Sequence, residues 1–190
     1  FLILYKSDLK ILLNTILFTG AFYLFFISLR DLFKKNFNKT SQKIGHFSFS
    51  LLILSILFNS FFSNEIITNI KVGDNYNNKN ISIFFKKIEN QKKNNYESLT
   101  GFFEIKDKMG NLNYFRPELR IYNQPIVITS EADIKTNLFS DKFLVMNVVK
   151  DSNYFNIRYQ VKPLMIWIWI SVVLLSVSGI LGIMERKNEK

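Results

Sequence analysis

One histidine stands out among the residues that could carry chemistry. His46 is the only histidine in 190 residues, within the stretch KIGHFSFSLL at positions 43–52. It follows Lys43 by three residues, which is roughly 4–5 Å along a helix axis. Position alone leaves two interpretations open. The ring could reach the lipid headgroups at a membrane surface, or it could bind iron as a ligand inside a helical span.

A second group lies in the stretch RPELRIY. Successive side chains of a β-strand point to opposite faces, so Arg116, Glu118, Arg120 and Tyr122 are expected to share one face. Charges of alternating sign can pair along such a face and remain in solvent. Alternatively, the face contacts a partner or a carboxylate such as a haem propionate, because arginine binds carboxylates in a bidentate manner.

The third group is the acidic pair Glu131 and Asp133 in TSEADI. General acid–base catalysis would require the two carboxyl groups to converge in space, and no histidine lies near them in the sequence. The chain has no cysteine. A disulfide framework, a thiolate nucleophile and a zinc–cysteine site are therefore excluded, as is a C-x-x-C-H haem-attachment site within this chain.

Three uncharged apolar runs are expected to position these residues. They cover residues 11–29, 45–62 and 164–184. Nineteen helical residues span roughly 28 Å, which is enough to cross the hydrocarbon core of a bilayer. Trp167 and Trp169 lie near the start of the third run, as is typical of membrane interfaces. The sequence predicts three transmembrane helices.

Charge indicates the orientation of these helices. The segment 30–43 holds five basic residues and one acid, and the tail ERKNEK is also basic. By the positive-inside rule both face the cytoplasm or its equivalent, and the segment between the second and third helices faces the opposite side. The net charge of +10 is therefore a topology signal. No basic stripe or base-stacking motif indicates a nucleic-acid partner.

The polar segment between the second and third helices reads as all-β. Seven short runs rich in Ile, Val, Phe and Tyr are separated by turn residues, which predicts a small barrel or sandwich. Only SEADIKTNLF suggests a helix, with Ser130 as its cap. We therefore predict an α+β membrane protein with an extracytoplasmic β insert. Its expected parts are 1–63 with two helices and a basic loop, 64–162 with the β domain, and 163–190 with the third helix and a basic tail.

An ordered set of motifs resembles the C-terminal part of the CcmF family. The motifs are GHFSFSLLILSILFNSFFSNEI, VGD, RPELRIYN, SEADI and VKPLMIWIWI, between about residues 40 and 184. CcmF proteins are haem lyases of the System I pathway of cytochrome c maturation. The resemblance implies that His46 matches one of two transmembrane histidines that bind a b-type haem. The family's tryptophan-rich segment and its other haem-binding histidines have no counterpart in this sequence.

The resemblance also implies partners and a location. The expected partners are the upstream part of the same protein or a split subunit, the haem chaperone CcmE, CcmH (with CcmI where present) and apocytochrome c, together with membrane lipid. The expected location is the inner membrane of a bacterium or a mitochondrion. The β domain would lie on the periplasmic or intermembrane-space side. Without the upstream half, the chain is not expected to attach haem by itself.

The sequence also leaves alternatives for the second axial ligand and for the function. The second axial ligand is expected outside this chain, although a pair of His46 with Met184 is also conceivable. The sequence begins with Phe, and its first methionine is Met109, so we expect it to have been cut from a longer polypeptide. The alternative function is a non-enzymatic assembly module that binds partners through its β domain. A channel or transporter is disfavoured because the spans contain no charged residues.

Overall fold

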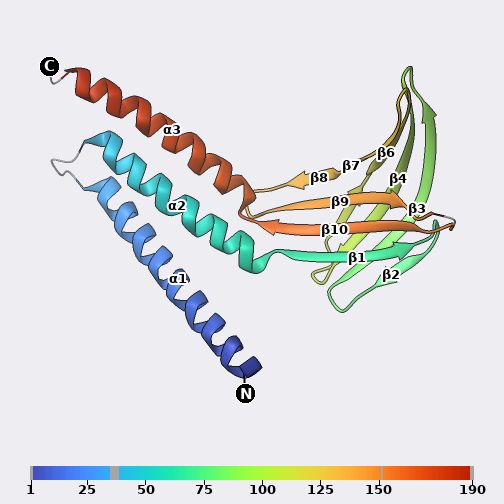
Figure 1. The fold of residues 1–190 in the computed structure, drawn as a ribbon, viewed down its shortest axis with the longest axis horizontal. Coiled ribbons are helices and arrows are strands. Elements are labelled where there is room, and N and C mark those ends of the chain that lie inside the picture. Colours follow the sequence, from blue (N-terminus) through green and yellow to red (C-terminus); the bar gives the residue numbers. More distant parts are fainter. Residues whose placement is uncertain (1, 35–38, 151, 189–190) are drawn as a thin grey trace. The chain divides into compact units, whose positions relative to one another are not determined.

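The computed structural model describes residues 2–34, 39–150 and 152–188, with three helices and ten strands in the order α1, α2, β1 to β10, α3 (Figure 1). The chain divides into two compact units. The first contains residues 1–63, 137–140 and 162–190, and the second contains residues 64–136 and 141–161. Lys35 of the expected basic loop and the last two residues of the basic tail lie outside the described residues.

The first unit is a helical layer in which α2 lies between α1 and α3 (Figure 1). The helices cover Leu2–Phe33 (α1), Thr40–Phe62 (α2) and Met165–Asn188 (α3). Each contains a 23-residue stretch long and apolar enough to cross a membrane. The expectation of three apolar helices is confirmed. Each helix extends past its uncharged run because backbone hydrogen bonds continue into charged residues such as Arg30 and Arg186.

Small residues bring α2 and α3 together. A methyl group added at Gly45 of α2 would lie only 2.7 Å from the Ser178 Oγ of α3, and one added at Gly182 would lie 3.6 Å from Ser41. The Ser178 hydroxyl donates to the Ser41 carbonyl oxygen at 2.7 Å. Glycine and serine allow helix backbones to approach closely where no hydrophobic effect drives association. Gly45 and Ser41 of α2 and Ser178 and Gly182 of α3 therefore form this helix contact.

The start of α2 is capped from another helix. The N-cap residue of α2 is Lys39, and its side chain makes no capping hydrogen bond. Instead the Glu185 carboxylate of α3 accepts hydrogen bonds from the Ser41 backbone N–H at 3.2 Å and from the Ser41 hydroxyl at 2.5 Å. Helix N-termini carry unsatisfied N–H groups and favour negative charge. At the other end, Asn59 Nδ2 donates to the Pro163 carbonyl oxygen at 3.0 Å.

The second unit is a β-sandwich of two antiparallel sheets. The four-stranded sheet has the order β1-β10-β9-β8, and the six-stranded sheet has the order β2-β3-β4-β6-β7, with β5 paired to β4. The strands are Asn64–Ile70 (β1), Asn75–Asn77 (β2), Ile81–Lys92 (β3), Tyr96–Asp107 (β4), Leu112–Phe115 (β5), Glu118–Asn123 (β6), Ile126–Glu131 (β7), Asp133–Thr136 (β8), Ser140–Val148 (β9) and Phe155–Pro163 (β10).

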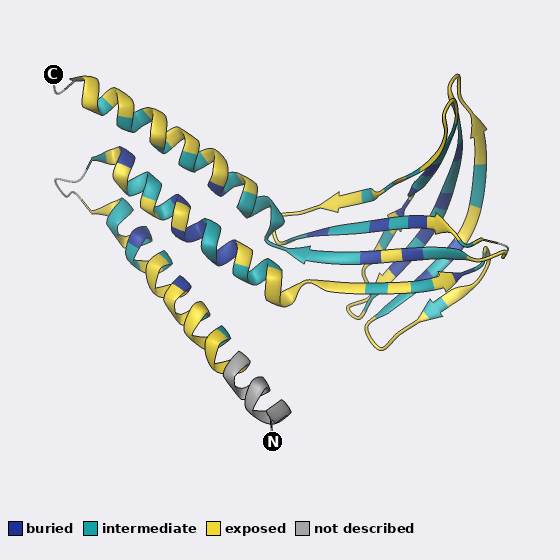
Figure 2. Cartoon of the chain, viewed as in Figure 1, coloured by how far each residue is buried: buried dark blue, intermediate teal, exposed yellow. Residues whose placement is uncertain are grey.

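The core of this unit is a cluster of buried side chains from both sheets, and Figure 2 shows stretches of buried residues along the strands. Phe85 and Phe103 of the six-stranded sheet stack with ring centroids 4.1 Å apart. Phe115 packs edge-on against Tyr159 of the four-stranded sheet at 5.8 Å. Both sheets thus contribute aromatic rings to one apolar core, and the expected small barrel or sandwich is a sandwich.

Two details of the β region differ from expectation. The run YFRPELRIY forms two strands instead of one, because Pro117 has no N–H for the ladder and separates β5 from β6. The helix expected from Ser130 is absent, and that prediction was wrong. Ser130 belongs to β7, and its hydroxyl bonds the side chain of Asn147. Long-range strand pairing overrides the local capping signal.

Candidate functional site

His46 lies in the second turn of α2 and lines a pocket between α1 and α2. The pocket has a volume of about 280 Å³ and is lined by Leu24, Ile27, Ser28, Asp31, His46, Phe49 and Ser50. The His46 side chain is exposed, and no hydrogen bond to it is formed by any residue that the structure describes. An imidazole beside apolar walls with its ring nitrogens unengaged is chemically suited to a ligand.

Two of the polar residues that line the pocket with His46 are satisfied by one another, and a third, Asp31, pairs with Arg30 at 3.5 Å. Ser28 of α1 and Ser50 of α2 share a hydrogen bond of 2.6 Å, and both are buried. Their hydroxyls also reach the Phe25 and Phe47 carbonyl oxygens of their own helices. This pair joins α1 to α2 and does not compete for the imidazole. The wall of the pocket that faces a ligand is therefore mostly apolar.

The Asp31 carboxylate lines the same pocket as His46, and no other His, Cys, Asp or Glu among the described residues does. No group of three or more His, Cys, Asp or Glu side chains gathers among them. Met184 is exposed on α3 and is not among the residues lining the His46 pocket. The structure does not bring the conceivable His/Met pair together at this pocket.

The alternate residues Arg116, Glu118, Arg120 and Tyr122 of RPELRIY lie on the outer face of the six-stranded sheet. Pro117 and Leu119 are buried in the sandwich, whereas Arg116 is exposed. Arg120 pairs with Glu118 at 3.0 Å and Glu131 at 3.5 Å. Its guanidinium also lies 5.2 Å from the centre of the Tyr96 ring, which packs against Tyr122.

These contacts set the ionisation of the pair. Burial raises the pKa of the Glu118 carboxyl, but hydrogen bonds from Ser98 and Arg120 and nearby positive charge outweigh it, so the pKa lies below its ordinary value. The same hydrogen bond raises the pKa of the Arg120 guanidinium above its ordinary value. Both groups stay charged at neutral pH and compensate each other. Arg120 is thus committed to contacts within the sheet.

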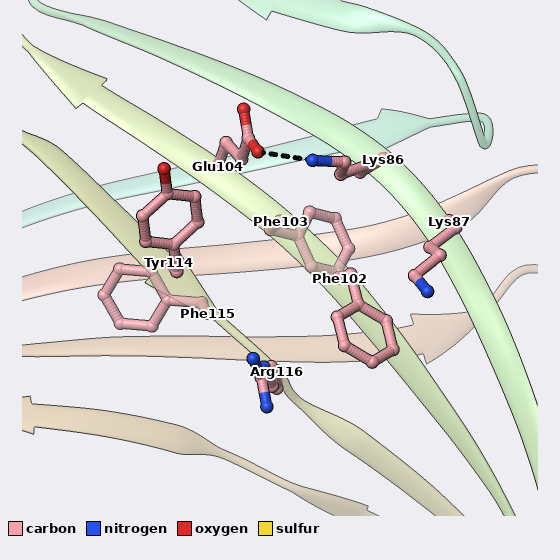
Figure 3. A pocket seen from close by; sticks show the side chains of 8 residues that line it. All are labelled: Lys86, Lys87, Phe102, Phe103, Glu104, Tyr114, Phe115 and Arg116. Carbon is pink, nitrogen blue, oxygen red and sulfur yellow. Dashed lines mark hydrogen bonds and ion pairs between the residues drawn. The ribbon is translucent and has the colours of Figure 1, made fainter.

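Arg116 differs from Arg120 because no carboxylate in the described part of the chain pairs with its guanidinium. It lies over the Phe102 ring, with 5.2 Å from its Cζ to the ring centre. Figure 3 shows Phe102 with Lys87 on one side and Arg116 on the other, in a pocket of about 350 Å³. Lys87 Nζ lies 4.8 Å from the centre of the same ring.

Glu131 and Asp133 do not form an acid–base pair in this structure. Glu131 belongs to the ion pair with Arg120. The Asp133 carboxylate accepts a hydrogen bond from the Arg116 backbone N–H at 2.6 Å. Each carboxylate therefore has a separate partner that fixes the sheet.

Sequence reasoning missed the residues that surround Arg116. Phe102, Lys86 and Lys87 carry no recognisable motif, and strand alternation alone does not say which strands are neighbours. A signal was present in GFFEIKD, where Phe102 and Glu104 alternate with the buried Phe103 and Ile105. It becomes informative only once β4 is known to lie between β3 and β5.

The helices and the sandwich define the class of this molecule as an α+β membrane protein with an all-β domain. Residues 61–163 match the family model described as the CcmF C-terminal beta-sandwich. Because this match covers more than half of the sequence, the chain belongs to the CcmF family. The expectation drawn from the ordered motifs is thereby confirmed.

Similar proteins support this assignment. The chain is 28% identical over 123 residues to the cytochrome c-type biogenesis protein ccl1 of Rhodobacter capsulatus, covering 65% of this chain and 19% of that protein. It is 20% identical over 178 residues to the cytochrome c-type biogenesis protein NrfE of Haemophilus influenzae, covering 92% and 28%. It is 21% identical over 146 residues to the cytochrome c-type biogenesis protein CcmF of Pseudomonas aeruginosa, covering 77% and 22%.

A solved structure shares the fold. It is described as Cytochrome c Heme Lyase CcmF and matches with a TM-score of 0.55 at 19% sequence identity, over 74% of this chain and 24% of that one. The chain therefore spans about a quarter of the length of its relatives, from 19% to 28%.

Proposed function

We propose that this chain contributes part of a membrane haem lyase that attaches haem to apocytochrome c, and that His46 is an axial ligand of a b-type haem. The observation that carries the proposal is the exposed His46 imidazole in the apolar pocket between α1 and α2. Family membership adds support, because the relatives are named as cytochrome c-type biogenesis proteins. Their activity as whole proteins is extended to this chain only as a proposal.

The residues of the pocket fit a haem. Imidazole is a standard axial ligand of haem iron, and the apolar side chains of Leu24, Ile27 and Phe49 suit a porphyrin face. The volume of about 280 Å³ is just below the usual range for ligand pockets, about 300–1,000 Å³. The α1–α2 pair would therefore form one wall of the site. When bound, the haem would supply one-electron chemistry that serves reduction of the substrate haem.

The other wall and the second axial ligand would come from outside this chain. His46 is exposed on a helix that is apolar enough to cross a membrane, and an unpartnered polar group in hydrocarbon is costly. The upstream part of the same protein, or a split subunit, would cover this face. The role of His46 is to hold the iron and fix the orientation of the porphyrin between helices.

The topology assigned from charge completes the proposal. The basic residues between α1 and α2 would face the cytoplasm or matrix, and the sandwich would lie in the periplasm or intermembrane space. There it would offer a docking surface to the haem chaperone CcmE, CcmH and apocytochrome c. The proposed location is the inner membrane of a bacterium or a mitochondrion.

The test uses the complete parent protein or complex, purified in detergent and reduced. We expect an absorption band of reduced b-type haem that is lost in His46→Gly and partly restored by added imidazole, because free imidazole can enter the space left by the side chain. The matched control is Gln42→Ala, an exposed residue one turn earlier on α2, which should keep the band. A normal haem band in His46→Gly without imidazole would refute the ligand assignment.

A non-enzymatic assembly module remains the second candidate. It is favoured by the uncompensated Arg116 on the outer face of the sandwich, which suits partner binding whether or not haem is present. In that case the His46 variant would retain cytochrome c maturation in cells, whereas the haem-ligand proposal predicts its loss.

A further inference from the structure

The outer face of the six-stranded sheet has a built pocket around Phe102. The pocket exists because the ladders on both sides of β4 are interrupted at this level. On one side, β3 has a bulge between Phe85 and Lys87, which leaves both Lys86 and Lys87 exposed. On the other side, Pro117 separates β5 from β6, and only the Gly101 N–H reaches its carbonyl oxygen, at 3.0 Å. Bulges commonly redirect side chains next to functional sites.

These interruptions gather positive charge on one aromatic ring. Lys86 pairs with Glu104 at 3.0 Å, and Lys87 pairs with Glu89. Arg116 has no such partner within the part of the chain that the structure describes. Asp133 engages only its backbone N–H. The pocket therefore presents one uncompensated guanidinium beside the Phe102 ring, as Figure 3 shows, and Tyr114 also lines the pocket. This combination suits a carboxylate that lies next to an apolar group.

The neighbouring strand favours a polypeptide as the source of that carboxylate. β5 pairs with β4 alone, and β8 is the end strand of the other sheet. The second edge of β5 is thus available for an extended segment, a common mode of peptide recognition. Leu112 and Tyr114 of β5 are exposed.

We propose that an extended acidic segment of a partner polypeptide docks along β5, with one of its carboxylates held by Arg116 over Phe102. The inference rests on the proposed docking role of the sandwich and does not depend on the haem site. Lys86 and Lys87 are compensated by Glu104 and Glu89, so Arg116 is the group that holds the carboxylate. The Phe102 and Tyr114 rings contact an apolar side chain of the same segment.

The experiment measures binding to the full 190-residue chain in detergent micelles by fluorescence anisotropy. The probe is a short labelled peptide of alternating Asp and Val, and the matched peptide has Asn in place of Asp. We expect the Asp peptide to bind at least tenfold tighter, with an affinity that falls as salt is raised. Arg116→Gln should weaken it by about tenfold or more. Arg158→Gln, an exposed arginine on the other sheet, should leave it unchanged.

Each other outcome has a defined meaning. Equal binding of the Asp and Asn peptides would keep docking on the sandwich but overturn the acidic specificity. Binding of neither peptide would overturn docking at this face altogether. Competition by free succinate as strong as by the peptide would make the ligand a small carboxylate and overturn the polypeptide. Phe102→Leu, which leaves all charges in place, should weaken the Asp peptide several-fold while circular dichroism verifies the fold. His46→Gly should leave peptide binding unchanged.

Discussion

A leucine at Gly45 should separate α2 from α3, whereas a leucine at Gly179 should not. The two glycines differ in surroundings: a Cβ at Gly45 would lie 2.7 Å from Ser178 Oγ, but a Cβ at Gly179 would meet nothing within 4 Å. Glycine in a helix interior is about 1 kcal/mol less favourable than alanine. Because both variants gain this helix propensity, the comparison between them isolates the helix contact.

The magnitude follows from two contributions. Ser178 must turn away from Gly45→Leu, which removes its hydrogen bond to the Ser41 carbonyl oxygen, worth about 1 kcal/mol. The remaining leucine atoms overpack the interface, at a cost of about 1–3 kcal/mol. Gly45→Leu should therefore be about 2–4 kcal/mol less stable than Gly179→Leu. Gly45→Ala should cause a smaller loss of stability than Gly45→Leu. Adding Ser178→Ala to Gly45→Ala should reduce that loss further, because it makes room for the added methyl group.

The assay is unfolding of the helical unit by titration with SDS in mixed micelles, followed by tryptophan fluorescence. Both tryptophans of the chain, Trp167 and Trp169, lie in α3. Trp167 reports packing directly because its indole N–H donates to the Leu138 carbonyl oxygen at 2.8 Å. If Gly45→Leu and Gly179→Leu unfold at the same SDS fraction, the close α2–α3 contact is not what stabilises the helical unit.

Two further predictions concern other parts of the molecule. Burial raises the pKa of the Tyr159 hydroxyl to about 12, helped by the charge of Asp107, so its contribution to stability is complete below about pH 10 and is lost as the pH rises towards 12. Alkaline unfolding monitored by circular dichroism should show a loss of about 2–3 kcal/mol. Tyr159→Phe should remove this pH dependence, and an unchanged profile in that variant would contradict the prediction. Glu185→Ala should destabilise the helical unit by about 1 kcal/mol in the SDS titration because it uncaps α2. Glu185→Gln keeps an acceptor oxygen and should lose less stability. Equal stability of the Glu185→Ala and wild-type chains would refute the cross-helix cap.

The Arg116 and Arg120 pair illustrates how sequence and structure divide the information. Strand alternation in RPELRIY predicts that both arginines lie on one face, and the buried Pro117 and Leu119 agree with this. It does not distinguish the two guanidiniums. Arg120 is compensated by Glu118 and Glu131, of which Glu131 belongs to the next strand. Which carboxylate reaches which arginine depends on strand register, and register depends on contacts along the whole sheet.

What the sequence by itself determined was the apolar spans, the all-β character of the segment between them and the family. The spans and the β character depend on the composition of continuous runs, because a span or a strand is recognised from neighbouring residues. The family was indicated by the resemblance of the ordered motifs. The isolation of His46 was also plain from the sequence. Its role as a haem ligand stays a prediction.

Only the tertiary structure decided which distant residues meet. Glu185 caps Ser41 across 144 positions of sequence. Phe102 contacts Lys87 of β3 and Arg116 of the segment between β5 and β6. The β3 bulge and the break at Pro117 create that pocket together, although they lie on different strands. Such contacts arise from the pairing of sheets and helices as wholes. No local pattern specifies these contacts, because the sequence around each residue would be the same whichever distant residue it contacted.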